Sequence, residues 1–295
     1  MLEKIYNQVF EIEKQCIRLK YTVIEDVYGD SKKYDSLFGK GDSVGMLAAF
    51  SIGAGISSEV NISKSEFEQF YNVFEDKVLL NKLLYIGDVG NVIGTLQNSV
   101  IEVSRACHEF FKLIGEEDFL IDNQPVVVDG LQSASGEIVS LVSALLNYIL
   151  IGLYSQLDFM TKIVFELENA QKDFSRYKKL VCQKITYGDK NRVTLKDLEG
   201  GVFSKSEYIM ILIYLRNEIV HNSSINSVSR IYQEVKDGKI VNKFILLPDF
   251  KDGLIQSFVN RKRFFRDDNK ANDLIPKIVD DVFDRIINTM LKVGS

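Results

Sequence analysis

The longest helical pattern in the chain constrains its fold most. From Glu137 to about Asp173, apolar residues recur every three or four positions and proline is absent, which predicts one long helix. The stretch from Ile138 to Leu157 is strongly apolar but is interrupted by serine and asparagine residues, so we expect a buried helix and no membrane span. Such a helix needs other helices around it, and Gly152 is where we expect a kink or break.

Other segments carry the same spacing. Apolar residues repeat at steps of three and four over residues 2–28, over residues 89–114 after Gly87, and from about Asn272 to Val293. Each of these patterns predicts an amphipathic helix. The chain has only three prolines in 295 residues, so long disordered tails are not expected.

Turn and cap signals complete the expected fold. Ser63 and Glu66 form a Ser-x-x-Glu capping box that predicts a helix start, whereas the polar, glycine-bearing residues 29–42 indicate a loop. Asp237-Gly238 lies between two strand-like runs, which predicts a β-hairpin near residues 230–247. The predicted class is therefore all-α, a helical bundle with a small β-hairpin insertion in the C-terminal half and a further helical region at the N-terminus.

Charge divides the chain into two parts. Residues 1–130 have a net charge of −9 and residues 131–295 a net charge of +4. Residues 116–136 collect acidic residues and glycines around the apolar patch 126–128, which is either a lone strand or part of a linker. We predict an acidic N-terminal helical region, 1–130, and a helical domain, 131–295. The second half is the one that could contact nucleic acid, although +4 is small enough to be a fluctuation of surface composition.

Cysteine and histidine are sparse. Cys16, Cys107 and Cys182 are far apart and odd in number, which argues against a disulfide framework and a cysteine zinc site. His108 has no second histidine one turn away, so we expect a structural or surface role for it. The N-terminus lacks the features of a secretory signal. We therefore expect a cytoplasmic setting, no cofactor and no metal.

The most unusual helix signal runs from Ser204 to Asn222. Ser204 and Glu207 form a second Ser-x-x-Glu box, which predicts the start of the helix. The apolar run 209–215 is dense enough to be buried, and it gives way abruptly to charged and polar residues. This change of character at the end of a buried helix singles out its last turns as a candidate site.

Three polar side chains lie close together in those last turns. Arg216 and His221 are five residues apart, about 140° around a helix, and so do not share a face. Asn217 and His221 are four residues apart and do share one. For Arg216 and His221 to act on one atom, the arginine must reach around the helix or a second copy of the helix must cross it. The spacing therefore indicates a cleft or a dimer interface.

The string LRNEIVHN at 215–222 resembles the Arg-x4–6-His signature of HEPN (higher eukaryotes and prokaryotes nucleotide-binding) domains. The match is Arg216-x4-His221, and Asn217 supplies the polar residue that most often follows the arginine. The resemblance covers about residues 137–295. It implies an all-α bundle, often a dimer with the motif of both chains at the interface, and a metal-independent ribonuclease in a toxin or defence system. The hairpin insertion and the acidic N-terminal half depart from the family pattern.

The residues also suit RNA cleavage on chemical grounds. Attack by the RNA's own 2'-hydroxyl needs a proton-transfer group that titrates near neutrality and a fixed cation for the developing charge. His221 would be the general acid/base, Arg216 the transition-state stabiliser and Asn217 the substrate positioner. Glu218 either holds the imidazole or faces solvent. The resemblance adds Asp158 as a polar residue of the preceding helix, although its own spacing also fits an exposed i,i+4 ion pair. The alternative is that Arg216 and His221 have no catalytic role and lie at the C-terminal end of a buried helix because cations interact favourably with the helix dipole there.

Two basic stretches are the candidate RNA-binding surfaces, and an ordinary solvated surface would have the same composition. Their residues are Lys178 and Lys179 in the first stretch, and Arg261, Lys262, Arg263 and Arg266 in the second. The leading hypothesis is a homodimeric endoribonuclease, with RNA or a nucleotide as ligand and an unidentified protein as a further regulatory partner. One alternative is a catalytically inactive module that binds RNA, a nucleotide or a protein. Another is a purely structural role, in which the motif residues stabilise a dimer interface.

Overall fold

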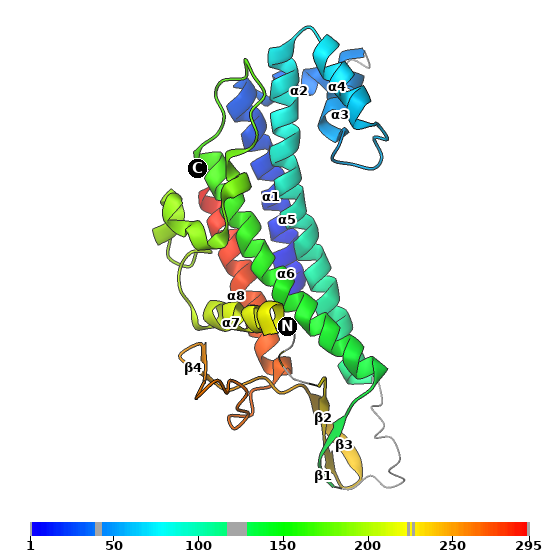
Figure 1. The fold of residues 1–295 in the computed structure, drawn as a ribbon, viewed down its shortest axis with the longest axis vertical. Helices are drawn as coiled ribbons and strands as arrows, with labels where there is room; N and C mark the ends of the chain where they lie inside the picture. The colour runs from blue at the N-terminus through cyan, green and yellow to red at the C-terminus, as the bar shows by residue number, and fades with distance from the viewer. Residues whose placement is uncertain (1, 39–42, 117–128, 223–224, 226–227, 294–295) are drawn as a thin grey trace. The chain divides into compact units, whose positions relative to one another are not determined.

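The chain is described from a computed structural model, which covers residues 2–38, 43–116, 129–222, 225 and 228–293. These residues are mostly helical with a small antiparallel sheet (Figure 1), which confirms the largely helical class. The α-helices are α1 (Leu2–Tyr28), α2 (Ser31–Phe38), α3 (Ser43–Gly53), α4 (Lys64–Val73), α5 (Lys77–Glu116), α6 (Glu137–Glu168), α7 (Glu207–Asn222) and α8 (Ala271–Lys292). Between α6 and α7 lie the 3-10 helices η1 (Val181–Lys184), η2 (Tyr187–Arg192) and η3 (Thr194–Asp197). The strands are β1 (Gly130–Ala134), β2 (Ile231–Lys236), β3 (Lys239–Phe244), β4 (Phe250–Lys251) and β5 (Leu254–Ile255).

The chain divides into two compact units. Unit 1 comprises Met1–Phe10, Ser99–Leu157 and Ser204–Arg285, and unit 2 comprises Glu11–Asn98, Asp158–Phe203 and Ile286–Ser295. Helices α1, α5, α6 and α8 each contribute residues to both units. The boundary between the units therefore does not follow the charge boundary at residue 130, because each unit draws on both halves of the sequence.

In unit 1, α5 and α6 approach closely at Gly152. A Cβ atom added to Gly152 would lie 2.5 Å from Cγ2 of Val103, so any larger residue there would force the valine side chain or a helix to shift. Helix α6 runs unbroken through this position, so the break expected there does not occur. By length and composition alone α6 could cross a membrane, but the core helix of a soluble protein passes the same test.

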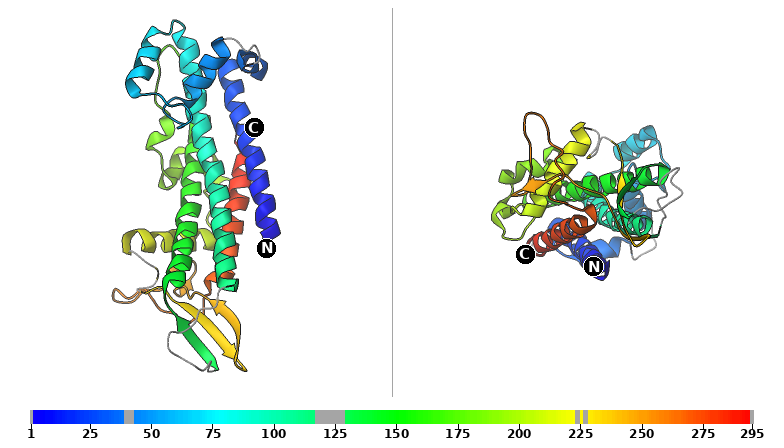
Figure 2. Two further views of the ribbon diagram at one scale, coloured as in Figure 1. Left: turned by 90° about the vertical axis from the view of Figure 1, so that its right-hand side faces the viewer. Right: turned by 90° about the horizontal axis from the view of Figure 1, so that it is seen from below.

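The small sheet of unit 1 contains the predicted hairpin. Strands β2 and β3 pair antiparallel, and Asp237 and Gly238 between them both have positive φ, 51° and 68°, as a two-residue turn of this type requires. The carboxylate of Asp129 accepts the N–H groups of Asp237 (3.1 Å) and Gly238 (2.9 Å). The sequence did not predict β1, which pairs with β2 as a third strand (Figure 2). The patch at 126–128 lies outside the described residues.

The helices of the N-terminal part of the chain match the sequence in part. The bounds predicted for α1 are confirmed, and so is the capping box that opens α4, in which Ser63 and Glu66 bond reciprocally. Helix α5 begins at Lys77, where the Asp76 carboxylate caps it by accepting the N–H of Leu79 at 2.9 Å. The helix predicted over residues 89–114 therefore starts earlier than expected and runs through Gly87. Part of the predicted loop 29–42 forms α2, and residues 39–42 lie outside the described part.

Residues 171–203, which we call the tethered segment, are held by three carboxylates of α6. Each carboxylate accepts a hydrogen bond from the first turn of one 3-10 helix, where N–H groups lack partners within the helix. The pairs are Asp158 with Tyr187 N (3.0 Å), Glu166 with Cys182 N (2.9 Å) and Glu168 with Thr194 N (2.9 Å). This otherwise irregular segment of unit 2 is thus fixed to a helix by side chains that the sequence distributes over residues 158–168.

Candidate functional site

Helix α7, which carries the candidate motif, starts two residues later than predicted. Ser206 is its N-cap, because the Ser206 Oγ accepts the N–H of Ile209 at 3.1 Å and its carbonyl accepts that of Met210. The predicted cap, Ser204, accepts instead from the guanidinium of Arg285. The predicted Ser204–Glu207 capping box is therefore wrong, because Ser204 is hydrogen-bonded to Arg285 of α8 and does not cap α7.

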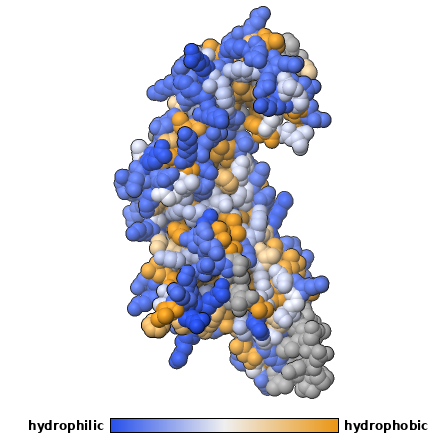
Figure 3. Space-filling view, in the orientation of Figure 1, coloured by the Kyte–Doolittle hydropathy of each residue, from blue (hydrophilic) through white to orange (hydrophobic). Residues whose placement is uncertain are grey.

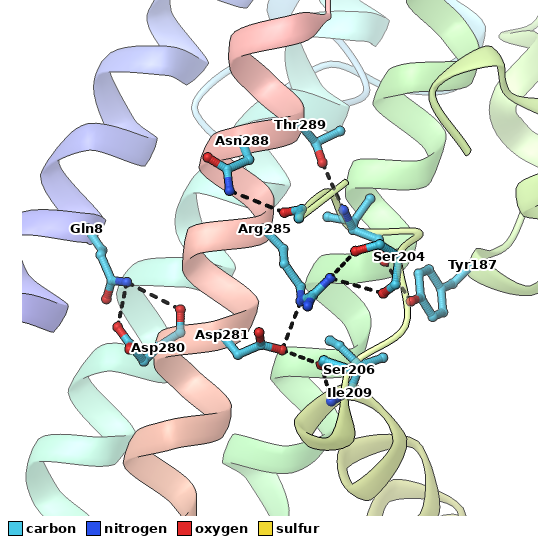
Figure 4. Close-up of polar contacts among 12 residues, drawn as sticks. Gln8, Tyr187, Ser204, Ser206, Ile209, Asp280, Asp281, Arg285, Asn288 and Thr289 are labelled. Carbon is cyan, nitrogen blue, oxygen red and sulfur yellow. Dashed lines mark hydrogen bonds and ion pairs between the residues drawn. The ribbon is translucent and has the colours of Figure 1, made fainter. Parts of the chain in front are cut away.

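Helix α8 anchors the start of α7 through a polar cluster (Figure 4). The hydroxyl of Ser206 donates to Asp281 Oδ2 at 2.7 Å, and the Nε of Arg285 donates to the same oxygen at 2.9 Å. The buried residues of α7 lie at helical spacing along its length and are Ile209, Ile211, Leu212, Leu215 and Ile219. Both sets of contacts fix α7 within unit 1, and its last three residues, 220–222, are exposed.

Arg216 is oriented but not neutralised. Its guanidinium lies over the ring of Tyr154 on α6, with Cζ 4.6 Å from the ring centroid, and its Nη1 donates to Asn217 Oδ1 at 3.0 Å. In the described part of the chain, no carboxylate forms an ion pair with it. A guanidinium held over an aromatic face keeps its positive charge and its remaining N–H donors, so Arg216 can still bind an anion.

His221 lies on another side of the same helix. Its side chain is exposed, and no residue among those described forms a hydrogen bond or an ion pair with its ring. The rotation of about 140° between Arg216 and His221 means that the two do not meet within one chain at α7. Asn217 lies between them, because it bonds to Arg216 and shares the helix face of His221.

Glu218 links the end of α7 to the second basic stretch. Its carboxylate accepts from Lys262 Nζ and from Asn222 Nδ2, both at 3.0 Å, and its side chain is only 14% exposed. Glu218 thus neither holds the imidazole nor faces solvent freely. A pocket of about 460 Å³ opens at this contact, lined by Glu218, Asn222, Asn260, Arg261, Lys262 and Arg263. The structure therefore brings three predicted RNA-binding residues beside the motif helix.

A buried carboxylate that the sequence did not reveal organises this basic stretch. Residues 256–266, which we call the basic hairpin, carry four basic residues, three phenylalanines and no acidic residue. Asp249, 3% exposed, accepts the N–H groups of Arg266 (2.8 Å) and Asp267 (2.9 Å) and donates its own N–H to the carbonyl of Phe264 (2.7 Å). A lone aspartate after a proline in a loop gives no sequence signal for such a role.

The other predicted site residues belong to unit 2. Asp158 forms an ion pair with Lys162 at 2.7 Å in addition to its bond to the tethered segment, so its carboxylate has structural partners. Lys178 lies 3.3 Å from Asp173, and Lys179 is exposed. Helix α7 belongs to unit 1, so the basic residues grouped together from the sequence fall into two groups, one in each unit.

The thiols are buried, and the metal-ligand residues of the described ranges are scattered. Burial raises the pKa of Cys16, Cys107 and Cys182 to about 12. In the described ranges, no three His, Cys, Asp or Glu side chains gather so that they could hold a metal ion. Comparison of the chain with models of known families, with curated proteins and with solved structures finds no match.

Proposed function

We propose that the chain is a HEPN-like, metal-independent endoribonuclease that cleaves RNA by attack of the 2'-hydroxyl, in a toxin or defence role. One observation carries the proposal. The end of α7 presents an oriented arginine, an exposed histidine and an asparagine that contacts the arginine and shares the histidine's face. A pocket lined by three cationic side chains lies beside them. These are the groups that transfer of a phosphoryl group within RNA needs.

The proposed reaction assigns a role to each motif residue. The imidazole of His221 takes the proton of the 2'-hydroxyl, the 2'-oxygen bonds to phosphorus, and the bond from phosphorus to the 5'-oxygen breaks. The leaving oxygen receives a proton from an imidazolium, and the products are a 2',3'-cyclic phosphate and a 5'-hydroxyl. Arg216 stabilises the negative charge that builds up on the phosphorane-like transition state, and Asn217 orients the phosphate or ribose.

The proposed enzyme acts as a homodimer. Because Arg216 and His221 lie on different sides of α7, one copy alone does not direct both at the same phosphate. Pairing of two α7 ends would bring the arginine of one copy near the histidine of the other. A protein that covers this face would regulate the activity.

The test is RNA cleavage in EDTA by the wild type, Arg216→Ala and His221→Ala, with His108→Ala as a control that removes the other, exposed histidine. Each motif variant should lose at least about 100-fold in rate, as removal of a general acid/base does, whereas the control should keep full activity. Mixing the two inactive variants should restore part of the activity if each site combines residues of two copies. Full activity in both motif variants would refute the proposed mechanism.

A second candidate, a non-catalytic RNA-binding module, is favoured by a specific observation. Within one chain the Arg216 guanidinium is held by Tyr154 and Asn217, can still bind an anion, and lies about 140° around the helix from His221. RNA binding that weakens steeply with salt, without any cleavage by the wild type, would support this candidate over the nuclease.

A further inference from the structure

The tip of the basic hairpin has a backbone conformation that its residues disfavour. Phe258 and Arg261 exchange two backbone hydrogen bonds, of 2.9 and 2.8 Å, around a two-residue turn. Val259 and Asn260 in this turn both have positive φ, 46° and 63°. Asparagine tolerates this region, but a β-branched residue is a true outlier there. Strain of this kind is concentrated at functional sites.

The side chains at this tip are not used by the fold. Phe258 is 72% and Val259 75% exposed, so no buried contact compensates for the strained turn. Phe264 and Phe265 of the same hairpin are also exposed. Apolar and strongly hydrophilic residues lie side by side over the region around β4 (Figure 3). An exposed aromatic tip next to cations is suited to a partner that is both planar and anionic.

The side chains that line the pocket at the base of this tip indicate which class of ligand would fit it. Its lining combines three cations with one carboxylate, and Lys262 pairs with that carboxylate, Glu218. Two side-chain amides, those of Asn222 and Asn260, complete it. Amides offer a donor and an acceptor together, as the edge of a nucleobase requires. A lipid headgroup phosphate would need only the cations, so the amides favour a nucleotide.

We infer that the basic hairpin and the end of α7 form a subsite for single-stranded RNA. The pocket takes one unpaired nucleotide, with Asn222 and Asn260 at the base edge and Arg261 and Arg263 at the phosphates. Phe258 stacks on the neighbouring base. The inference rests on the proposed function only in taking RNA as the ligand, and it holds whether or not the RNA is cleaved. A duplex is excluded because paired bases cannot splay out onto an aromatic side chain.

The test measures binding by fluorescence anisotropy, using a short 2'-O-methylated RNA that cannot be cleaved through its 2'-oxygen. The single strand should bind at least about tenfold more tightly than its duplex. Phe258→Ala should weaken binding of the single strand by about 5- to 100-fold, and Phe258→Tyr, which keeps the ring, should restore it. Phe10→Ala is the matched control, because Phe10 is also in unit 1 and 66% exposed; it should leave the affinity unchanged.

The remaining variants test the charges. Arg261→Gln should reduce the slope of log affinity against log salt by about 0.7, the value for one phosphate contact to a single strand. Equal affinity for single strand and duplex, or an unchanged affinity of Phe258→Ala, would overturn the inference. So would Phe258-dependent binding to anionic phosphatidylserine vesicles without RNA binding. Loss of cleavage in the motif variants with this binding pattern intact would separate the subsite from the proposed catalysis.

Discussion

The tethered segment of unit 2 and the basic hairpin of unit 1 are both irregular and basic, yet the structure treats them differently. Asp158, Glu166 and Glu168 of α6 hold the tethered segment at the starts of its three 3-10 helices. In the basic hairpin, Asp249 accepts two backbone N–H groups and Glu218 of α7 pairs with Lys262, and the tip stays strained. Carboxylates of α6 thus bond to the backbone of the first segment, whereas Glu218 of α7 bonds to a side chain of the second, Lys262.

The basic side chains of the two segments also differ in their contacts. In the tethered segment, Arg192 lies over the ring of Phe165, 5.1 Å from its centroid, and Lys178 pairs with Asp173. In the basic hairpin, Lys262 pairs with Glu218, and Arg261 lines the pocket beside this pair. Basic composition therefore does not separate cations with structural contacts from those that we propose to bind RNA. The contacts of each side chain must be known from the structure, as for Arg192 on the ring of Phe165.

The largest effect is expected for Glu166→Ala in the tethered segment. Glu166 is 2% exposed and accepts the hydroxyl of Tyr85 (3.1 Å) and the N–H of Cys182. Its removal leaves both donors buried without this acceptor, which should lower the free energy of unfolding by about 2–4 kcal/mol. Urea denaturation measures it, with the more exposed Glu168→Ala as the control, for which we expect about 1 kcal/mol. An equal cost for both variants would mean that burial does not set the strength of these tethers.

Asp249→Asn should have a smaller effect on stability but a clear effect on RNA binding. The amide keeps one acceptor oxygen and loses the other, which should cost about 1–2 kcal/mol and loosen the basic hairpin. RNA affinity should fall several-fold, whereas Glu166→Ala should not change it. If Glu166→Ala weakened RNA binding as much as Asp249→Asn, the division of the two segments into structural and ligand-binding roles would fail.

Local signals in the sequence were sufficient for the regular elements. The periodicity over residues 2–28 matches α1, and Asp237-Gly238 marks the turn between β2 and β3. The string Ser204-x-x-Glu207 fits the capping pattern as well as Ser63-x-x-Glu66 does, yet Arg285, distant in sequence, takes Ser204. A cap signal fails where a tertiary contact competes for the same oxygen.

The candidate site could be predicted only to the extent that helix geometry defines it. The angle between Arg216 and His221 follows from their spacing on α7. The ring of Tyr154 beneath Arg216, and the bond between Lys262 and Glu218, join residues far apart in the chain. No periodicity encodes such contacts, because they depend on how α6, α7 and the basic hairpin meet in unit 1.

Val259→Gly should make the tip of the basic hairpin more stable. Glycine adopts a φ of 46° without the clash of a β-branched side chain, so we expect a local gain of about 1 kcal/mol. Slower hydrogen exchange of the Arg261 amide, which bonds to the carbonyl of Phe258, would report it. Asp237→Gly is the control, because aspartate tolerates its φ of 51° and should gain less. Faster exchange in Val259→Gly would show that the valine is not strained.

The smallest effect concerns the contact between Asp88 and the tethered segment, and its sign depends on pH. Burial raises the pKa of Asp88, while the hydroxyl of Tyr177, 2.5 Å away, acts in the opposite direction. Below the pKa of aspartate in the unfolded chain, about 4, Asp88 is protonated in both states and its charge has no effect on stability. As the pH rises above this value, the raised pKa of Asp88 in the folded state means that its ionisation destabilises the fold. Asp88→Asn keeps an acceptor for Tyr177 and removes the charge, so it should stabilise the protein at pH 7 and have little effect at pH 3.

Asp173→Asn is the control of opposite sign for that experiment. The N–H and hydroxyl of Ser175, followed by Lys178, lower the pKa of Asp173 to about 2. Its ionised form therefore stabilises the fold above the unfolded pKa, and this contribution is lost only as the pH falls towards 2. Asp173→Asn should lower the urea midpoint at pH 7, where Asp88→Asn raises it, and both differences should shrink on acidification. A shift in the same direction for both variants at pH 7 would contradict this assignment, in which the charge of Asp88 destabilises the fold and the charge of Asp173 stabilises it.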